Sequence, residues 1–534
     1  MLSPTLTPAP HQPSTSPHLM LKTMAEKIIK EGKAEILAGD KVFYNHIQQF
    51  NRDLSVMVIR SWHELYHDHF KSRKRNHEQT EPANAPYINI LEALSATGLR
   101  SIRYARELDH VNKIVANDLL ADAVKLINEN IQYNNLSDKL VANHGDAIKY
   151  MGSTNTKFHV VDLDPYGTAM PFIDSAIQCI KDEGILLVTC TDAGVLAGSG
   201  YPEKCFSLYG GNNFGGSMMG SESNHEVGIR LILNSIAQIA SKYKKSIEPL
   251  LSLSIDYYFR LIIKVRTSAI EVKELASTTM MTYHCAGCGD KINQYLGRKS
   301  AEKGKGKYQY PRVVLPASEC QYCESAFHLA GPMYGGIIHN KNFIEKVLEI
   351  NAKSDPEVYQ TTERIKGMLT LALNELETPS YFNLNQLSSF FKAPPISIHQ
   401  FCNAIGSLGY KVSLTHAKKN CVKTNAPWEV ILQVNKQWLK KCNLQLIEDF
   451  DNGKVNKTDK VIEKINKLRE NPEMSSNLTE GMIGYKILKN LKGELTVDFD
   501  TENEESMKIK KLRGLKMVRF QENPKNWGPK ARPK

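Results

Sequence analysis

The sequence predicts an α/β protein whose larger part is a doubly wound parallel sheet, followed by a smaller α+β region with a metal-binding module. Between residues 88 and 266, short apolar runs alternate with amphipathic stretches of helical period. Apolar strands that alternate with helices are typical of βαβ units, in which helices cover both faces of a parallel sheet. Two close pairs of cysteines lie between residues 280 and 330, and they predict the metal-binding module.

The composition of the whole chain limits the classes of protein that fit it. Its 534 residues are enough for two or three domains. The formal net charge of +11 suits a polyanionic partner, such as nucleic acid or a membrane surface. No apolar run approaches the roughly 20 residues that span a bilayer, so we expect no membrane span. The remaining cysteines are scattered singly, which is typical of a reducing compartment rather than of a disulfide framework.

The first predicted strand, INILE, ends at Glu92 and is followed by the small residues Ser95, Ala96 and Gly98. Such a turn lets the backbone approach a ligand, and the helix that follows offers free N–H groups at its start. The turn has a single glycine, so it is a poor match to the G-x-G-x-x-G pattern of dinucleotide-binding proteins. On its own it does not define the ligand.

Acidic residues follow the next two predicted strands. Asp118 ends the second strand, where a carboxylate can accept hydrogen bonds from both hydroxyls of a ribose. Asp146 and Ala147 follow the third strand, where the carboxylate can bind an adenine amine and a backbone N–H can serve a ring nitrogen. Each acid alone is more often a helix N-cap. Acids at successive strand ends on one sheet edge predict a nucleotide-like cofactor there.

The fourth predicted strand delivers Asp164, Pro165, Tyr166 and Gly167 to the same edge. A carboxylate here can accept an N–H of an exocyclic amino group and take up the proton lost when that group is methylated. Pro165 fixes the turn and Tyr166 offers a ring on which a flipped base can stack. An ordinary tight turn is the alternative, but its position beside the cofactor edge favours a catalytic loop with Asp164 as base. Asp162 is a rival carboxylate, for which we expect an ion pair at the core edge.

Two C-x-x-C pairs predict a tetrahedral zinc site. Four thiolates leave no open coordination position, so we expect the zinc to be structural; a redox role for the pairs is the alternative. The 31 residues between Cys288 and Cys320 exceed the usual spacing. We expect this insert to be a mobile basic loop that contacts phosphates. The four predicted ligands are Cys285, Cys288, Cys320 and Cys323, and the basic residues of the insert are Arg298, Lys299, Lys303, Lys305 and Lys307.

From about residue 31 to its end, the chain resembles the tRNA (guanine26-N2)-dimethyltransferase family. The matching segments are EGKAEI, VFYN, FNRDLS, EALSATGLRSIRYA, VANDL, GDA, DLDPYG, GPMYGG and NWGPKAR, with the two C-x-x-C pairs. The resemblance implies a Rossmann-like class I methyltransferase domain with S-adenosylmethionine as methyl donor. It also implies mono- and then dimethylation of the amino group of guanine 26 in tRNA.

The same resemblance implies roles for individual residues. Arg52 and Arg100 would contact the donor, Asp118, Asp146 and Ala147 would hold its ribose and adenine, and Asp164 would be the base. A guanidinium at Arg100 can pair bidentately with the methionine carboxylate. The residues around Arg52 alone favour a surface or interdomain ion pair instead.

We expect five regions along the chain. Residues 1–24 form a disordered tail or a weak presequence, 25–275 the methyltransferase domain, 276–335 the four-cysteine zinc module, 336–450 a C-terminal RNA-binding domain, and 451–534 a charged segment with a basic tail. Two short helices joined by a Pro-containing turn make the fourth region compatible with a winged helix. The Asn-rich stretch 451–505 is expected to be partly disordered.

Three other functions compete with this interpretation. They are an amino-methyltransferase acting on another base or RNA, a nicotinamide-dependent oxidoreductase with a structural zinc, and a catalytically inactive tRNA-binding zinc protein. The missing G-x-G-x-x-G pattern disfavours the second, and the intact acids disfavour the third. We expect tRNA as partner, a monomer, and residence in the nucleus or the mitochondrion, with the cytosol left open.

Overall fold

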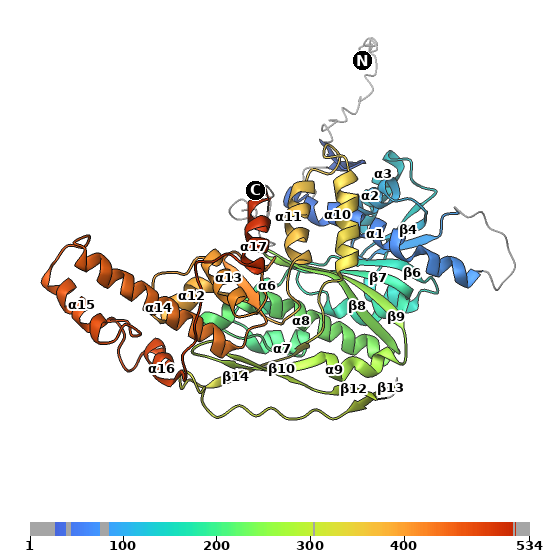
Figure 1. The fold of residues 1–534 in the computed structure, drawn as a ribbon. Coiled ribbons are helices and arrows are strands. Elements are labelled where there is room, and N and C mark those ends of the chain that lie inside the picture. The colour runs from blue at the N-terminus through green and yellow to red at the C-terminus, as the bar shows by residue number, and fades with distance from the viewer. Residues whose placement is uncertain (1–26, 39–43, 75–84, 303–304, 516–517, 519–534) are drawn as a thin grey trace, which may run out of the picture.

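The computed structural model describes residues 27–38, 44–74, 85–302, 305–515 and 518. Its centre is a seven-stranded sheet in the order β5-β4-β3-β6-β7-β9-β8 (Figure 1). The first five strands in that order are parallel, as the sequence predicts. The strands are β3 (Ile88–Glu92), β4 (Val111–Asp118), β5 (Leu140–His144), β6 (Phe158–Leu163), β7 (Ile180–Cys190), β8 (Lys245–Ile255) and β9 (Tyr258–Thr267).

Two strands that the sequence analysis did not name, β8 and β9, extend the five parallel strands at one edge. Strand β9 runs antiparallel to both β7 and β8. Only Asp256 and Tyr257 separate β8 from β9, and so short a connection can join only antiparallel neighbours.

Helices cover both faces of the sheet, which explains why the strands are apolar throughout. Ile90 and Val160 point into the core on one face, whereas the next residues along, Leu91 and Val161, point into the core on the other. The first face is covered by α1 (Gln49–Lys74), α2 (Leu99–Glu107) and α3 (Ala121–Tyr133). The second is covered by α4 (Ala147–Ser153), α5 (Met170–Cys179), α6 (Ala193–Leu196), α7 (Pro202–Tyr209) and α8 (Met218–Lys242).

Two further groups of elements pack on the first face. The hairpin of β1 (Lys27–Glu31) and β2 (Ala34–Ala38) contacts α2 and α3. The helices α10 (Lys341–Lys353) and α11 (Thr362–Leu373) stand beside α1, although they come after the cysteine module in sequence (Figure 1). Phe343 and Leu369 of these helices are fully buried in the same core as Ile90.

The cysteine module is a three-stranded antiparallel sheet in the order β11-β10-β14. Its elements are η2 (Glu271–Glu274), α9 (Leu275–Thr278), β10 (Thr279–Cys285), β11 (Lys291–Tyr295) and β14 (Phe327–Tyr334). The insert expected to be a mobile loop instead contains a paired hairpin, β12 (Arg298–Glu302) and β13 (Lys305–Gln309). Lys303 and the side chain of Lys305 lie outside the described part of this hairpin.

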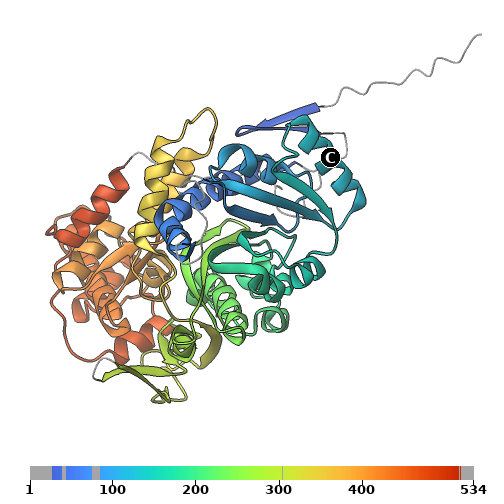
Figure 2. The same ribbon diagram turned by 90° about the vertical axis from the view of Figure 1, so that its right-hand side faces the viewer.

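The C-terminal elements gather on the side of the molecule away from α3 (Figure 2). The two predicted short helices, α12 (Leu384–Phe390) and α13 (Ile398–Ser407), are present and are joined through Pro394 and Pro395. They are flanked by a small sheet in the order β15-β17-β16. Its strands are β15 (Phe382–Asn383), β16 (Val412–Leu414) and β17 (Cys421–Thr424).

The expectation of partial disorder between residues 451 and 505 is wrong. After α14 (Trp428–Asp451) the chain forms α15 (Asp459–Glu470), α16 (Ile483–Asn490) and α17 (Glu504–Gly514). The charged composition hid a few well-spaced apolar residues: Ile465 and Leu468 of α15 are 1% exposed, and Ile487 of α16 is fully buried. The basic tail beyond α17 and the first 26 residues lie outside the described part of the chain. Among the described residues, no helix is both long enough and apolar enough to cross a membrane.

Candidate active site at the carboxyl edge of the sheet

The ends of β3, β4 and β5 are tied together by the acids predicted there. The Asp118 carboxylate accepts the backbone N–H groups of Ala96 and Leu120, each at 2.9 Å. The N–H of Gly145 donates to the carbonyl oxygen of Asp118 at 3.0 Å, which joins the ends of β4 and β5. Gly98 begins α2 with a φ of 77°, a left-handed conformation that favours glycine.

Asp146 caps α4, as an acid at this position commonly does. Its Oδ1 accepts the N–H groups of Ile148 at 2.8 Å and Lys149 at 3.2 Å. No hydrogen bond from the described residues reaches its other oxygen, Oδ2. Leu119 and Ile148 expose apolar side chains beside these two acids, at 65% and 41%. The edge therefore offers polar acceptors between apolar flanks, which fits an adenosine moiety.

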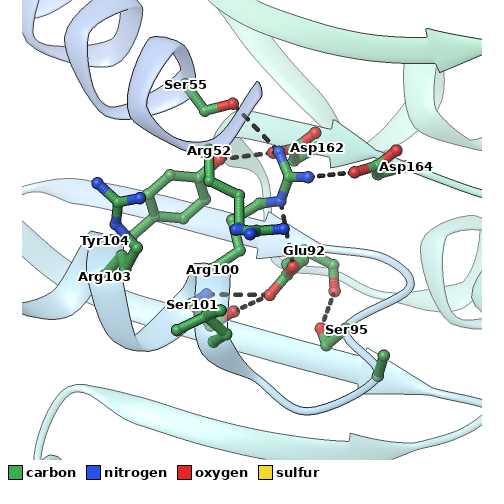
Figure 3. Close-up of polar contacts among 12 residues, drawn as sticks. Arg52, Ser55, Glu92, Ser95, Arg100, Ser101, Arg103, Tyr104, Asp162 and Asp164 are labelled. Carbon is green, nitrogen blue, oxygen red and sulfur yellow. Dashed lines mark hydrogen bonds and ion pairs between the residues drawn. The ribbon is translucent and has the colours of Figure 1, made fainter. Parts of the chain in front are cut away.

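Arg100, the second residue of α2, lies among the acids that end β3 and β6 (Figure 3). Its guanidinium contacts Asp162 at 3.3 Å and Glu92 at 3.6 Å, and it forms a close ion pair with Asp164. It also donates to the Ser55 hydroxyl at 3.1 Å. Arg100 is 5% exposed, so these contacts form in a largely dry environment.

Asp162 forms the core ion pair expected of it. Its carboxylate is fully buried and binds Arg260 at 2.9 Å and the Tyr104 hydroxyl at 2.6 Å, in addition to Arg100. Burial alone would raise the pKa of Asp162, but the two guanidinium groups outweigh it and lower the pKa. This carboxylate is thus a fixed negative charge of the core and is not available to a substrate.

Asp164 lies at the open edge. Its side chain is 24% exposed, and Asn51 of α1 lies 3.5 Å from its Oδ2. The loop that it begins is anchored to the end of β7: the Gly167 N–H donates to Thr191 Oγ1 at 2.7 Å, and the Thr191 N–H donates to the Gly167 carbonyl at 2.8 Å. Tyr166, between these points, is 72% exposed. Gly167 has a φ of 88°, so the turn needs a glycine.

Arg52 of α1 is held by an ion pair. Its Nε lies 2.6 Å from Glu31 at the end of β1, and its NH2 group donates to the carbonyl oxygen of Asn45 at 3.0 Å. Burial would raise the pKa of Glu31, but Arg52 and Arg103 outweigh it and lower the pKa to about 2. In this structure Arg52 therefore joins α1 to the N-terminal hairpin.

Sequence reasoning missed several residues that contact the site acids, of which Arg260 and Asn51 are two. Arg260 sits between apolar residues in the strand YFRLIIKVRT, and an arginine within such a run is a usable signal for a buried ion pair. Asn51 precedes Arg52 in FNRDLS, and nothing in its local pattern distinguishes it from a surface asparagine.

The four predicted metal ligands are brought together. All four are buried, and their Sγ atoms lie within 4.8 Å of one another. The Sγ atoms of Cys285 and Cys323 are 3.4 Å apart, and those of Cys288 and Cys320 are 3.6 Å apart. These distances are far longer than the roughly 2.05 Å of a disulfide. A side chain at Gly287 would lie 2.9 Å from Cys323 Sγ, so the first knuckle needs a glycine there.

A second buried group of ligand types, formed by His339, Glu375 and His416, fits a proton network better than a metal. His416 Nε2 accepts the Ser254 N–H at 3.2 Å, and its Nδ1 lies 2.7 Å from Glu375. Lys423 binds the same carboxylate at 2.9 Å. The imidazole lone pair of His416 that a metal would need thus already accepts a hydrogen bond, and Lys423 already supplies a positive charge to the carboxylate.

A doubly wound sheet, acids at successive strand ends and an acid-Pro-aromatic loop at the next strand end together define an S-adenosylmethionine-dependent amino-methyltransferase. The model of the family described as N2,N2-dimethylguanosine tRNA methyltransferase matches residues 24–436. The chain belongs to that family, which confirms the resemblance seen in the sequence. It is an enzyme that methylates the N2 amino group of guanine 26 in tRNA.

Known proteins support this assignment along most of the chain. The mitochondrial tRNA (guanine(26)-N(2))-dimethyltransferase of Saccharomyces cerevisiae is 46% identical over 95% of this chain and 92% of its own length. The human tRNA (guanine(26)-N(2))-dimethyltransferase is 32% identical over 96% of this chain and 78% of its own. The structure of Trm1 from Pyrococcus horikoshii with S-adenosyl-L-methionine is 26% identical, covering 76% of this chain and 99% of its own, with a TM-score of 0.60.

Proposed function

We propose that this chain dimethylates guanine 26 with Asp164 as the proton acceptor. The observation that carries this proposal is the position of Asp164: it is the partly exposed carboxylate at the end of β6, beside the strand ends that carry Asp118 and Asp146. The lone pair of an exocyclic amine is delocalised into the ring. A carboxylate that accepts one N–H draws that pair out and takes up the proton lost on methylation.

The exposed Tyr166 and the rigid Pro165 complete the catalytic loop. Tyr166 offers a stacking surface for a base flipped out of the tRNA. The two hydrogen bonds between Gly167 and Thr191 hold that surface in place. Positioning the amine against Asp164 then lowers the entropic part of the barrier.

The cofactor fits a Rossmann-like class I methyltransferase domain at residues 25–275. S-adenosylmethionine supplies an electrophilic methyl group when bound. The fit rests on Oδ2 of Asp146 beside Ala147 and on the apolar Leu119 and Ile148. We assign the adenine to Asp146 and Ala147 and the ribose to Asp118, and we assign the donor's carboxylate to Arg100, with Arg52 nearby.

Zinc is the metal that we assign to the four cysteines. Zn–S bonds of about 2.3 Å place the sulfurs of a tetrahedral site about 3.8 Å apart. The sulfur separations of 3.4 and 3.6 Å lie close to that value. Four thiolates leave no position for substrate, so the role is structural.

The elements beyond the sheet are assigned to tRNA binding. The arrangement β15-α12-α13-β16-β17, with β17 between the other two strands, supports a winged helix within the proposed RNA-binding domain 336–450. The hairpin β12–β13 carries Arg298, Lys299 and Lys307, which suit phosphates. We further propose that the protein is a monomer and works in the nucleus or the mitochondrion.

The substitution Asp164→Asn tests the catalytic assignment. It keeps the shape of the side chain but removes the base, so we expect the formation of dimethylguanosine to fall at least about 100-fold. Binding of tRNA should stay within about threefold of the wild type, and S-adenosylhomocysteine should bind no more weakly than it does to the wild type. Mass spectrometry of tRNA nucleosides measures the product, and formation of dimethylguanosine at the normal rate would refute the assignment.

A further inference from the structure

Asp192 lies just beyond β7 and next to the catalytic loop, yet it has no part in the proton transfer assigned to Asp164. Strands β6 and β7 are parallel neighbours, with Leu163 opposite Val188. The hydrogen bonds between Thr191 and Gly167 then bind the chain directly before Asp192 to the end of the loop that carries Asp164. Asp192 thus follows the strand adjacent to that of the proposed base.

The Asp192 carboxylate differs from the acids that end β3 and β6. Glu92, Asp162 and Asp164 each pair with Arg100, whereas no cation of the described residues lies within ion-pair distance of Asp192. Asp192 precedes α6 but its side chain does not cap that helix. It is only partly exposed, and burial raises its pKa. Lys204 of α7 lowers the pKa of Asp192 only from beyond ion-pair distance, so this partly buried carboxylate keeps capacity to accept a hydrogen bond from a ligand.

The Tyr209 hydroxyl binds this carboxylate, and toward an ionised carboxylate it can act only as a hydrogen-bond donor. The Tyr209 hydroxyl lies 2.7 Å from Oδ1 and 2.9 Å from Oδ2 of Asp192. Tyr209 is 1% exposed, and burial together with the nearby Cys190 and Asp192 raises its pKa far above the usual range. The hydroxyl therefore stays protonated and fixes the direction of the carboxylate, leaving its remaining lone pairs for an incoming donor.

We propose that Asp192 selects guanine by accepting the N1–H of the target base, while Asp164 accepts the adjacent N2–H. Tyr209 is the positioning residue. This inference rests on the proposed function of Asp164. Guanine presents N1–H and N2–H side by side, so two neighbouring carboxylates match that edge. Adenine and cytosine present a ring nitrogen lone pair at the corresponding position, which a carboxylate repels. The N1 proton stays on the base throughout, and Asp192 takes no proton.

The test compares tRNA carrying guanine with tRNA carrying 2-aminopurine at position 26. 2-Aminopurine keeps the 2-amino group but has a bare N1, and it also lacks O6. The wild type should strongly prefer guanine. An asparagine at position 192 can donate its amide N–H to the bare N1, so Asp192→Asn should lower the guanine to 2-aminopurine ratio of kcat/KM by about 100-fold. Because both enzymes face the same loss of O6, that loss cancels in the comparison.

Matched variants separate recognition from structure. Glu203→Gln, an exposed acid on the neighbouring α7, should leave the ratio unchanged. Tyr209→Phe should lower the ratio in the same direction as Asp192→Asn, by about 10-fold, and carries the test if Asp192→Asn does not fold. A ratio that stays at the wild-type value in the folded Asp192→Asn protein overturns the inference. If Asp164→Asn forms dimethylguanosine at the normal rate, the proposed role of Asp164 fails instead.

Discussion

Arg100 holds three carboxylates at once, and this sets the charge of the site. Together with Arg260 it supplies two positive charges against Glu92, Asp162 and Asp164. A donor carboxylate that pairs with Arg100 must compete with Asp164 for the guanidinium. On the proposed roles, that competition would release Asp164 at the moment when a base is needed, so we expect donor binding and base activation to be coupled through Arg100.

The substitution Arg100→Lys tests that coupling. A lysine keeps the charge but loses the planar fork that reaches several carboxylates. We expect the KM for S-adenosylmethionine to rise about 10-fold, which corresponds to about 1.4 kcal/mol. Arg106→Lys, an exposed arginine on the same helix, is the matched control and should leave KM unchanged. Steady-state kinetics at saturating tRNA give both values, and an unchanged KM in Arg100→Lys would contradict the assignment of Arg100 to the donor.

At the residue scale, the local sequence predicted which acidic side chains lie at the carboxyl edge of the sheet. It did not predict their ion-pair and hydrogen-bond partners. The acids at 118, 146 and 164 follow predicted strands, and the parallel order of those strands brings them to one edge. The contact between Asp192 and Tyr209 depends on how α7 packs, which no local pattern reveals. Pairings between residues distant in sequence, such as Arg52 with Glu31, likewise follow from tertiary packing.

At the element scale, strongly periodic segments were predicted and weakly apolar ones were not. Strands β3, β4 and β6 are apolar because both faces are covered, so their pattern is clear. Helix α15 buries only two apolar residues, and most of its other residues are charged. Its sequence therefore resembles that of a disordered segment. The β12–β13 hairpin is likewise polar, and its pairing was not evident from composition.

The cysteine module should stabilise more than its own strands. Its four cysteines share a buried core with Leu387 and Phe401 of the C-terminal helices and with Met219 of α8. Metal loss would therefore loosen the contact between the sheet domain and the C-terminal elements. Apparent binding energies of structural zinc are about 10 kcal/mol or more, so the effect on folding is large.

We expect one bound zinc per chain and its loss in Cys288→Ser. The variant should melt at least about 5 °C below the wild type. Metal binding stabilises the folded state, and a protein that no longer binds the metal loses that stabilisation. Cys442→Ser, a single cysteine on α14, is the matched control and should keep both zinc and melting temperature. Elemental analysis and calorimetry measure the two quantities. A wild-type protein free of zinc, or a Cys288→Ser protein with full zinc content, would argue against the site.

At the scale of the whole molecule, buried polar networks join the layers. Residues 252 and 254 of the edge strand β8 donate backbone N–H groups to His339 and His416. Glu375 binds His416 and Lys423, and Lys423 also binds Glu226 of α8 at 2.9 Å. The C-terminal elements are thus attached to the sheet through buried imidazoles and paired charges, in addition to apolar contacts.

This attachment should make stability fall on acidification. Burial lowers the pKa of His339 to about 3, with the nearby His416 and Lys423 acting in the same direction and Glu375 and Glu226 opposing it. The folded pKa lies below the value of about 6.5 in the unfolded chain. Protons therefore bind preferentially to the unfolded state, so the stabilisation is complete above about pH 6.5 and is lost as the pH falls toward 3.

The substitution His339→Asn isolates this contribution. Asparagine can keep an acceptor for the Ser252 N–H but does not titrate. Between pH 7.5 and 5.5, the free energy of unfolding of the wild type should fall by about 1.4 kcal/mol more than that of the variant. His328→Asn, an exposed histidine, should follow the wild type. Denaturant unfolding at the two pH values measures the difference, and parallel losses in wild type and His339→Asn would show that His339 is not held neutral. Comparing each variant with the wild type at each pH removes any loss of metal common to all three proteins, so the remaining difference reports the imidazole that joins β8 to the C-terminal elements.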